Sequence, residues 1–342
     1  MNKWYEKSGE MGDVIVSTRI RLARNLKKYP FPHKLNLKER KDINEIVTDV
    51  LLNGNSALAN KFKVIDLDKL NEVNLVSLVE RHLVSPNFIS NKESGRLLLL
   101  DNETISIMLN EEDHIRIQVM KEGLDLDGTY DLADKIDLLL GEKLSYAFNS
   151  KLGYLTQCPT NLGTGMRASI MLHLPALQRN GYIDRISSNL SKLGLTLRGS
   201  YGEGTQAIGA LYQISNQVTL GLSEKDSINN LKNVVLQLVE QERSARKILS
   251  KDVKVLDKIN RSFGILLYSK ILSNEEFMNL ISNVRLGVSI GEIQNLTYDT
   301  ISSLIIDVQP ATLMKNNGKE MLPFERDELR ASIVRQKLFE NK

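Results

Sequence analysis

The sequence of 342 residues contains a single cysteine, Cys158, so no disulfide can form within the chain. A lone cysteine is typical of a reducing compartment, and we expect a cytoplasmic protein. Long apolar runs are missing as well: the longest, such as the four leucines at 97–100, are far too short to span a bilayer. The first 13 residues have no apolar core, so we expect neither a signal peptide nor a membrane partner.

An excess of one charge is also absent. The 45 Lys and Arg residues nearly balance the 42 Asp and Glu residues, and a net charge of +3 gives no overall field that favours direct binding of nucleic acid. No repeat of fixed period and no low-complexity tract is visible. The remaining composition, 42% hydrophobic and 25% charged, is that of an ordinary globular protein with one large or two smaller domains.

The pattern of apolar residues predicts an α+β fold. Alternating β-branched residues and connections too short for parallel pairing predict antiparallel strands at 13–21, 96–100, 105–109, 114–120, 170–174 and 211–215. Helical spacing predicts helices at 37–50, 70–86, 129–144 and 223–249, with another between the last two strands. The pattern after residue 250 is almost entirely helical. We therefore predict an antiparallel β-sheet backed by helices over 1–250 and a C-terminal helical domain over 251–342.

The segment STRIRLARN at 17–25 places Arg19 and Arg21 on the same face of a strand. Two adjacent guanidinium groups repel each other unless an anion lies between them, and the arginine fork suits phosphate oxygens. Taken alone, however, the segment is better explained as a solvated basic edge strand, or as a nucleic-acid patch together with Lys27 and Lys28.

The segment NEEDHIR at 110–116 places three consecutive acidic residues in a tight turn, and Arg116 follows on the emerging strand. A solvated hairpin is the usual explanation and the better one for this segment alone. The functional interpretation is a carboxylate that binds a cation and takes a proton from it.

Two glycine-containing segments follow. CPTNLGTGMRAS at 158–169 joins Cys158 to a loop in which glycine lets backbone N–H groups approach an anion, and then to Arg167. It has the spacing of neither a Walker loop nor a Rossmann fingerprint. By itself, Cys158 would most often be a small buried hydrophobe. LRGSYGEGTQ at 197–206 adds Arg198, three glycines and Glu203.

Together and in this order, the four segments resemble the signature segments of the ATP:guanidino phosphotransferases, the family of creatine and arginine kinases. The resemblance extends over roughly residues 13–242 and implies an antiparallel sheet backed by helices. It also implies roles for individual residues. The positions that match nucleotide-binding residues of the family are Ser17, Arg19, Arg21, His82, Arg116, Arg167 and Arg198. The positions that match the clamp on the substrate guanidinium are Glu112, Cys158 and Glu203.

The chemistry of phosphoryl transfer accounts for these residue types. The transition state is loose, so five arginines and the Mg²⁺ that arrives with ATP would align the reactants and stabilise the charge. We expect no metal ligand among the protein side chains. A guanidinium, with a pKa above ~12, is a poor nucleophile while it is protonated. Glu112 and Glu203 would hold it and accept its proton, Cys158 would add a third negative partner, and Arg167 would complete the catalytic set.

Two differences from the energy-storage kinases resemble the McsB family of bacterial protein arginine kinases. About 16 residues precede the first segment, where the energy-storage kinases have a helical domain that helps to enclose a free small substrate, and a helical region follows residue 250. In the McsB family an RDxxRA motif senses phosphoarginine. Here FERDELRAS at 324–332 would place Arg326, Asp327 and Arg330 on one helical face. The alternative is an ordinary solvated charge run.

The resemblance implies an enzyme that transfers phosphate from MgATP to exposed arginines of proteins, including a stress-gene repressor, and marks them for Clp protease degradation. It further implies a zinc-binding activator protein as partner, allosteric regulation and a homo-oligomer. Two alternatives stay open: a free-arginine phosphagen kinase, and a phosphoarginine-binding adaptor without activity. The five arginines and both carboxylates argue against the adaptor.

Overall fold

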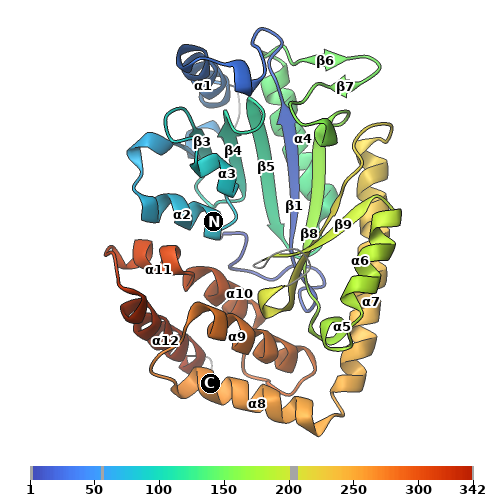
Figure 1. Ribbon diagram of the computed structural model, residues 1–342, viewed down its shortest axis with the longest axis vertical. Helices are drawn as coiled ribbons and strands as arrows, with labels where there is room; N and C mark the ends of the chain where they lie inside the picture. Colours follow the sequence, from blue (N-terminus) through green and yellow to red (C-terminus); the bar gives the residue numbers. More distant parts are fainter. Residues whose placement is uncertain (1–2, 55–57, 201–206, 341–342) are drawn as a thin grey trace.

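The computed structural model describes residues 3–54, 58–200 and 207–340 and centres on an eight-stranded antiparallel sheet (Figure 1). The strands lie in the order β2-β3-β4-β5-β1-β8-β10-β9. Their bounds are Ile15–Arg24 (β1), Phe62–Asp66 (β2), Arg96–Leu100 (β3), Ile105–Leu109 (β4), Ile115–Glu122 (β5), Met166–His173 (β8), Leu195–Gly199 (β9) and Leu211–Asn216 (β10). Phe148–Asn149 (β6) and Gly153–Tyr154 (β7) form a separate small hairpin. The α+β prediction is confirmed.

The sequence pattern missed β2 and β9, which are the two edge strands of the sheet. An edge strand pairs on one side and leaves much of its surface in water, so its apolar alternation is weak. In β2 Phe62 is buried whereas Lys63 and Val64 are exposed. The strands inside the sheet carry the strong patterns that the sequence shows.

Alternation along the strands gives the sheet two chemically different faces. Ile20 and Leu22 of β1 and Ile117 of β5 belong to the main core, which α4 (Leu126–Gly141) and α7 (Glu224–Leu249) cover. On the other face α2 (Glu72–Glu80) and α3 (Pro86–Ile89) pack over β3 and β4 in a smaller apolar cluster. Arg19 and Arg21 alternate with Ile20 and Leu22, so they project from this second face.

The predicted helix over 70–86 is wrong in its second half, because the chain turns there. Helix α2 ends at Glu80, and His82 has a positive φ of 59°, a left-handed conformation that a helix cannot contain. Ser85 then caps the one-turn helix α3 by accepting a hydrogen bond from the Phe88 amide (3.1 Å), and Pro86 occupies the first helical position. This turn places His82 at the edge of the open sheet face.

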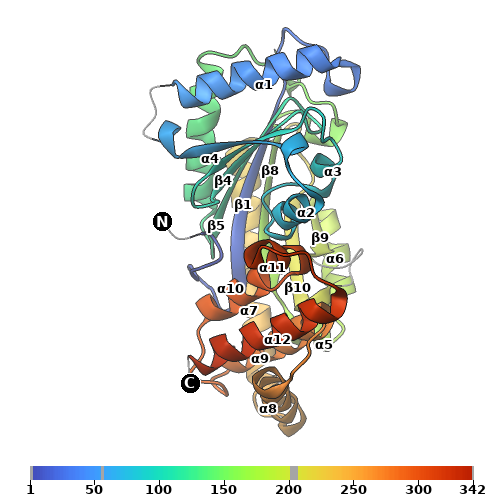
Figure 2. The same cartoon turned by 90° about the vertical axis from the view of Figure 1, so that its left-hand side faces the viewer.

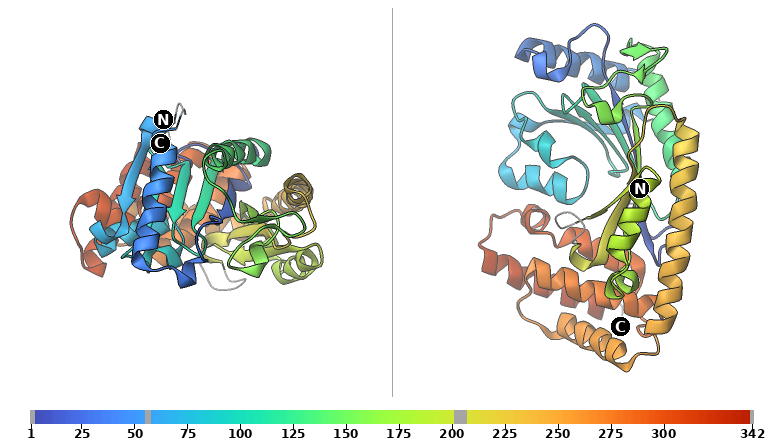
Figure 3. Two further views of the ribbon diagram at one scale, coloured as in Figure 1. Left: turned by 90° about the horizontal axis from the view of Figure 1, so that it is seen from above. Right: turned by 45° about the vertical axis from the view of Figure 1, so that its right-hand side comes forward.

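The C-terminal region is helical, as predicted. It comprises α8 (Val253–Tyr268), α9 (Asn274–Ser289), α10 (Tyr298–Asp307), α11 (Pro310–Asn317) and α12 (Pro323–Phe339). Figure 2 shows these helices at the end of the sheet opposite α1 (Leu37–Leu52), and Figure 3 shows α7 running along one side of the molecule towards α8. The predicted boundary near residue 250 falls in the short break between α7 and α8. One apolar cluster nevertheless continues across it, from Leu249 to Val255 and Val334.

Two short helices, α5 (Pro175–Arg179) and α6 (Ile183–Lys192), lie between β8 and β9. Among the described helices, none combines the length and the apolar character needed to cross a membrane.

Candidate active site

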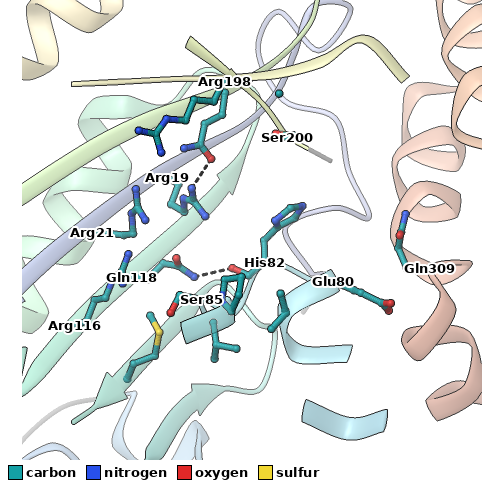
Figure 4. Close-up of a pocket in the computed structure, with 16 residues that line it drawn as sticks. Arg19, Arg21, Glu80, His82, Ser85, Arg116, Gln118, Arg198, Ser200 and Gln309 are labelled. Atoms are coloured by element: carbon teal, nitrogen blue, oxygen red, sulfur yellow. Dashed lines mark hydrogen bonds between the residues drawn. The ribbon is translucent and has the colours of Figure 1, made fainter. Parts of the chain in front are cut away.

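Strand register brings the predicted arginines together on the open face of the sheet. Arg21 of β1 lies opposite Arg167 of β8, and Arg19 lies opposite Ser169. Arg116 enters from β5 and Arg198 from β9, so four strands each contribute to one cluster. Figure 4 shows the side chains of Arg19, Arg21, Arg116 and Arg198 converging on one pocket. The cluster joins segments nearly 180 residues apart in the sequence.

The arginines line two adjacent cavities. The larger cavity, about 400 Å³, is bordered by Arg19, Arg198 and His82, with Val79, Val84, Pro86 and Met108 forming an apolar part. The smaller cavity, about 170 Å³, is bordered by Glu111, Glu112, Arg167 and the loop residues Thr160 and Asn161. Arg21 and Arg116 line both cavities. The apolar wall suits a flat base, the shared arginines suit an anion, and the acidic cavity suits a cation beside that anion.

The guanidinium groups are too crowded to be balanced by the carboxylates around them. Burial, together with the charges of Arg116 and Arg167, lowers the pKa of Arg19 to about 10. The pKa of Arg21 is lowered further, by burial and by three neighbouring arginines. Among the described residues, the Nε atoms of Arg21 and Arg167 are buried and find no hydrogen-bond acceptor. A polyanion such as a chain of phosphates would supply both the missing charge and the missing acceptors.

Neighbouring side chains fix the orientation of two of the arginines. Arg19 donates from Nε to Ser169 Oγ (3.3 Å) and from its terminal nitrogen to Gln213 of β10. Arg116 donates to both carboxylate oxygens of Glu111 (2.6 Å each), and Ser85 also donates to this carboxylate (2.6 Å). Burial alone would raise the pKa of Glu111, but Arg116 and Ser85 together hold it below its usual value.

The two glutamates of NEEDHIR therefore differ in their surroundings. The carboxylate of Glu111 is saturated by Arg116 and Ser85. Glu112 lines the smaller cavity, and its carboxylate makes no hydrogen bond within the part of the chain that the structure describes. Burial and other arginines lower the pKa of Arg167. The negative charges of Cys158 and Glu112 act in the opposite direction and raise it. Glu112 is the carboxylate that is open to a substrate cation.

Cys158 lies at the start of a tightly held loop. Its side chain is half-buried, with Sγ 3.0 Å from Thr160 Oγ1, so it is not the fully buried hydrophobe that a lone cysteine usually is. Gly163 has φ 111°, and a Cβ atom there would lie 2.2 Å from the carbonyl oxygen of Thr219. Only glycine fits this approach. Thr219 also donates its hydroxyl to the carbonyls of Thr160 (3.0 Å) and Leu162 (2.7 Å).

The sequence did not reveal the residues that lock three of the segments together. Asn25 donates to Asp113 (2.6 Å) and to the Leu155 carbonyl (3.0 Å), and accepts from the His114 amide (3.0 Å). Asp113 also accepts from the amide of Gln157, next to Cys158 (2.8 Å). Asn25 ends the first quoted segment and Asp113 and His114 lie inside the second, but the sequence pattern assigned them no role. Their contacts fix Glu112 and Cys158 relative to each other.

The other predicted site residues lie as follows. His82 is half-buried beside Arg19, and burial with the Arg19 charge lowers its pKa to about 3, so the imidazole is neutral at pH 7. Ser17 is buried in β1 on the same side as Arg19. Arg198 lies at the end of β9, and Glu203 lies outside the described residues.

The RDELRA segment lies on α12, where Arg330 has a different environment from the one predicted. Arg330 is 1% exposed and donates to the carbonyls of Val308 (3.0 Å) and Leu272 (2.7 Å), and it also pairs with Asp327. The prediction that the three residues share a helical face did not show that Arg330 is buried, with its guanidinium bonded inside the domain. Arg326 and Asp327 remain half-buried at the surface.

Sequence profiles of known families match most of the chain. The ATP:guanido phosphotransferase C-terminal catalytic domain matches residues 42–245, which include the acidic, cysteine and Arg198 segments. The chain belongs to the ATP:guanido phosphotransferase family. A second profile, the protein-arginine kinase McsB C-terminal domain, matches residues 252–342.

Curated relatives in this family match nearly the whole chain. A protein-arginine kinase of Caldanaerobacter subterraneus subsp. tengcongensis is 47% identical over 328 residues, which are 95% of this chain and 97% of that protein. A protein-arginine kinase of Clostridium acetobutylicum is 47% identical over 340 residues, 99% of this chain and 100% of that protein.

Two solved kinase structures share the fold over about two thirds of this chain. A substrate-free duplicated taurocyamine kinase from Schistosoma mansoni is 28% identical, with a TM-score of 0.58 over 69% of this chain and 36% of that chain. Lombricine kinase is 26% identical, with a TM-score of 0.59 over 69% of this chain and 68% of that chain.

Proposed function

We propose that this protein transfers the γ-phosphoryl group of MgATP to arginine side chains of proteins. The observation that carries the proposal is the pair of adjacent cavities that share Arg21 and Arg116. The larger cavity combines arginines with an apolar part, and the smaller one adds the carboxylates of Glu111, Glu112 and Asp113 to its arginines. A nucleotide in the first would direct its terminal phosphate towards a guanidinium in the second.

The roles of the residues follow from this geometry. Arg19, Arg21, Arg116, Arg167 and Arg198 bind the phosphates and stabilise the charge that spreads over the transferring group. Glu112 orients the guanidinium and accepts the proton that nitrogen loses on phosphorylation. Cys158, which begins the loop that borders the smaller cavity at Thr160 and Asn161, would add a negative or polar partner, and Glu203 would be a second carboxylate. Among the described residues no group of three potential ligands is placed to hold a metal ion, so the nucleotide phosphates would carry Mg²⁺.

The curated relatives favour a protein substrate over free arginine. They are named protein-arginine kinase, and the match to this chain covers almost their full length. The test is to incubate the protein with MgATP and either an unfolded protein or free L-arginine, and to measure acid-labile phosphate on each. We expect phosphate on the protein substrate. Rapid phosphorylation of free arginine without labelling of protein would make the chain a free-arginine kinase, and no transfer at all would leave the phosphoarginine-binding adaptor.

The wider role is part of the same proposal. We infer a bacterial cytoplasmic enzyme of the stress response that marks proteins, including a stress-gene repressor, for the Clp protease, works with a zinc-binding activator protein and forms a homo-oligomer. The lone cysteine supports the compartment, and the McsB-type C-terminal region supports the assignment. The measurement is degradation of a labelled substrate by the Clp protease, which should require prior incubation with this enzyme and ATP.

Replacing Cys158 by Ala should lower the turnover rate with an arginine-containing protein by about 10- to 100-fold, because a contact to a charged group is worth ~1.5–3 kcal/mol. ATP affinity should stay the same, since Cys158 does not line the larger cavity. Steady-state kinetics against both substrates measure the effect. Thr160→Val is the matched control, because it removes the hydroxyl beside Sγ without removing the thiol. Unchanged turnover of Cys158→Ala would remove the thiol from the site.

Regulation by phosphoarginine is tested best at Arg326. Asp327→Ala would leave buried Arg330 without its partner and so confuse regulation with stability. We expect Arg326→Ala combined with Asp327→Asn to abolish the response of the kinase rate to added phosphoarginine and to leave basal activity in place. The measurement is the rate as a function of phosphoarginine concentration, with Glu328→Gln, on the same exposed turn, as control. Identical response curves would make RDELRA an ordinary charged helix.

A further inference from the structure

The catalytic region and the C-terminal helices meet at a carboxylate that lies next to the larger cavity. Glu80, the last residue of α2, accepts hydrogen bonds from the amides of Ala311 (2.9 Å) and Thr312 (2.7 Å) and from the Thr312 hydroxyl (2.8 Å). Ser77, one turn earlier, lies 3.3 Å from the same hydroxyl. These amides belong to the first turn of α11, where backbone donors have no partner within the helix.

Glu80 replaces the cap that α11 lacks in its own sequence. Gln309 occupies the N-cap position, but its side chain makes no capping bond and instead donates to the Ile305 carbonyl (2.8 Å). A carboxylate at a helix N-terminus also interacts favourably with the helix dipole. The start of α11 is therefore completed by a residue more than 200 positions earlier in the chain.

Glu80 and the N-cap residue of α11, Gln309, both border the larger cavity, although the amides that bond to Glu80 do not. Glu80 and Gln309 line it together with His82, which follows Glu80 by two residues across the left-handed turn (Figure 4). Of the described residues that line the cavity, Gln309 alone comes from the C-terminal region. The bonds from Glu80 to α11 thus anchor the end of α2 two residues before His82.

We propose that the C-terminal region completes the nucleotide site, with Glu80 and Thr312 as positioning residues that hold the α2–His82 wall of the cavity in its binding position. This inference rests on the proposed function, in which the larger cavity receives ATP. Because Glu80 bonds to α11 and not to the reacting groups, its contribution is to nucleotide affinity and not to the chemical step.

The connection between α10 and α11, which contains Gln309, is also held by a residue of α12. Arg330 donates to the carbonyl of Val308, the residue before Gln309, and is anchored by Asp327. Glu80 and Arg330 therefore hold the two sides of the short connection between α10 and α11. The connection that contributes Gln309 to the cavity is therefore fixed by contacts from both α2 and α12.

Other contacts hold the two regions together independently, so loss of Glu80 should not unfold the protein. Arg285 of α9 donates to the Gly12 carbonyl (2.6 Å), and Asp299 of α10 accepts from the Ser8 amide (2.8 Å). Asp299 does not line the cavity. Asp299→Asn is therefore a matched control that weakens a contact between the same regions at a distance from the nucleotide.

The experiment compares Glu80→Gln, Thr312→Val, their double variant and Asp299→Asn. Isothermal titration measures binding of ADP and a non-hydrolysable ATP analogue, and kinetics measure KM for ATP, KM for the protein substrate and kcat. We expect nucleotide affinity to fall ~10-fold in Glu80→Gln, because the hydrogen bonds from α11 to the charged carboxylate are weakened. The value of kcat should change little, because Glu80 does not contact the reacting groups. The double variant should lose no more than Glu80→Gln alone, and Asp299→Asn should bind nucleotide normally.

The outcomes separate this inference from the proposed function. If the wild-type protein binds no adenine nucleotide, the proposed function fails. If the wild type binds and Glu80→Gln binds equally well, or loses only as much as Asp299→Asn, Glu80 merely joins the two regions and the inference is wrong. If Glu80→Gln does not fold, Thr312→Val decides alone: reduced affinity at unchanged kcat supports the inference, and unchanged affinity overturns it.

Discussion

Replacing Glu112 by Gln is expected to lower kcat by ~10²–10⁴-fold, the usual contribution of a general base. The amide keeps the shape of the side chain but can neither hold the guanidinium by charge nor accept its proton. Glu112 lines the smaller cavity and the larger one is bordered by other residues, so the affinity for ATP should change little. Single-turnover kinetics with saturating nucleotide measure the rate of phosphoryl transfer directly.

The neighbouring Glu111 is the control, because the same substitution there should act differently. Glu111 holds Arg116 through two hydrogen bonds of 2.6 Å, so Glu111→Gln should loosen Arg116 and raise KM for ATP. The thermal stability of Glu111→Gln should fall as well, since the half-buried guanidinium of Arg116 loses its counter-charge. If Glu111→Gln removed the chemical step and Glu112→Gln left it intact, the assignment of the two carboxylates would be reversed.

Local patterns predicted the features that depend on one segment. The i, i+2 spacing of Arg19 and Arg21 predicted that they share a face, and the short turns between 96 and 120 predicted antiparallel pairing. The hydrogen-bond partners of Arg19 could not be predicted from local sequence patterns. Ser169 and Gln213 reach it through strand register across β1, β8 and β10, and register is set by packing that involves the whole sheet.

The wrong helix end and the unforeseen burial of Arg330 have the same physical origin. The apolar spacing of residues 70–86 continues past Glu80, but tertiary packing breaks the helix at His82, whose positive φ no local pattern announces. On α12 the i, i+4 spacing of Arg326 and Arg330 does not reveal which side of the helix faces the interior. Arginine is rarely buried, and Arg330 is buried because the carbonyls of Val308 and Leu272 require a donor.

Replacing Arg21 by Met is expected to reduce kcat/KM by at least ~10³-fold, as for other arginines that stabilise a transferring phosphoryl group. The same change should make the nucleotide-free protein more stable. Arg21 is crowded by Arg19, Arg116 and Arg167, and its Nε is buried without an acceptor among the described residues. Removing such a group relieves ~1–3 kcal/mol, which corresponds to a rise in Tm of a few degrees. Differential scanning calorimetry of the wild type and Arg21→Met without nucleotide measures the difference in Tm.

Arg24 on the same strand supplies the matched control. Its side chain leaves β1 on the other face, where it pairs with Asp137 (2.7 Å) and lies 3.5 Å from the ring centre of Tyr154. Arg24→Met leaves the Asp137 carboxylate buried without its partner, so Tm should fall. Inorganic triphosphate should raise the Tm of the wild type and of Arg24→Met, and should have little effect on Arg21→Met. A fall in Tm for both variants would mean that the arginine cluster is balanced without a bound anion, and the phosphate-binding role of Arg21 would lose its physical basis.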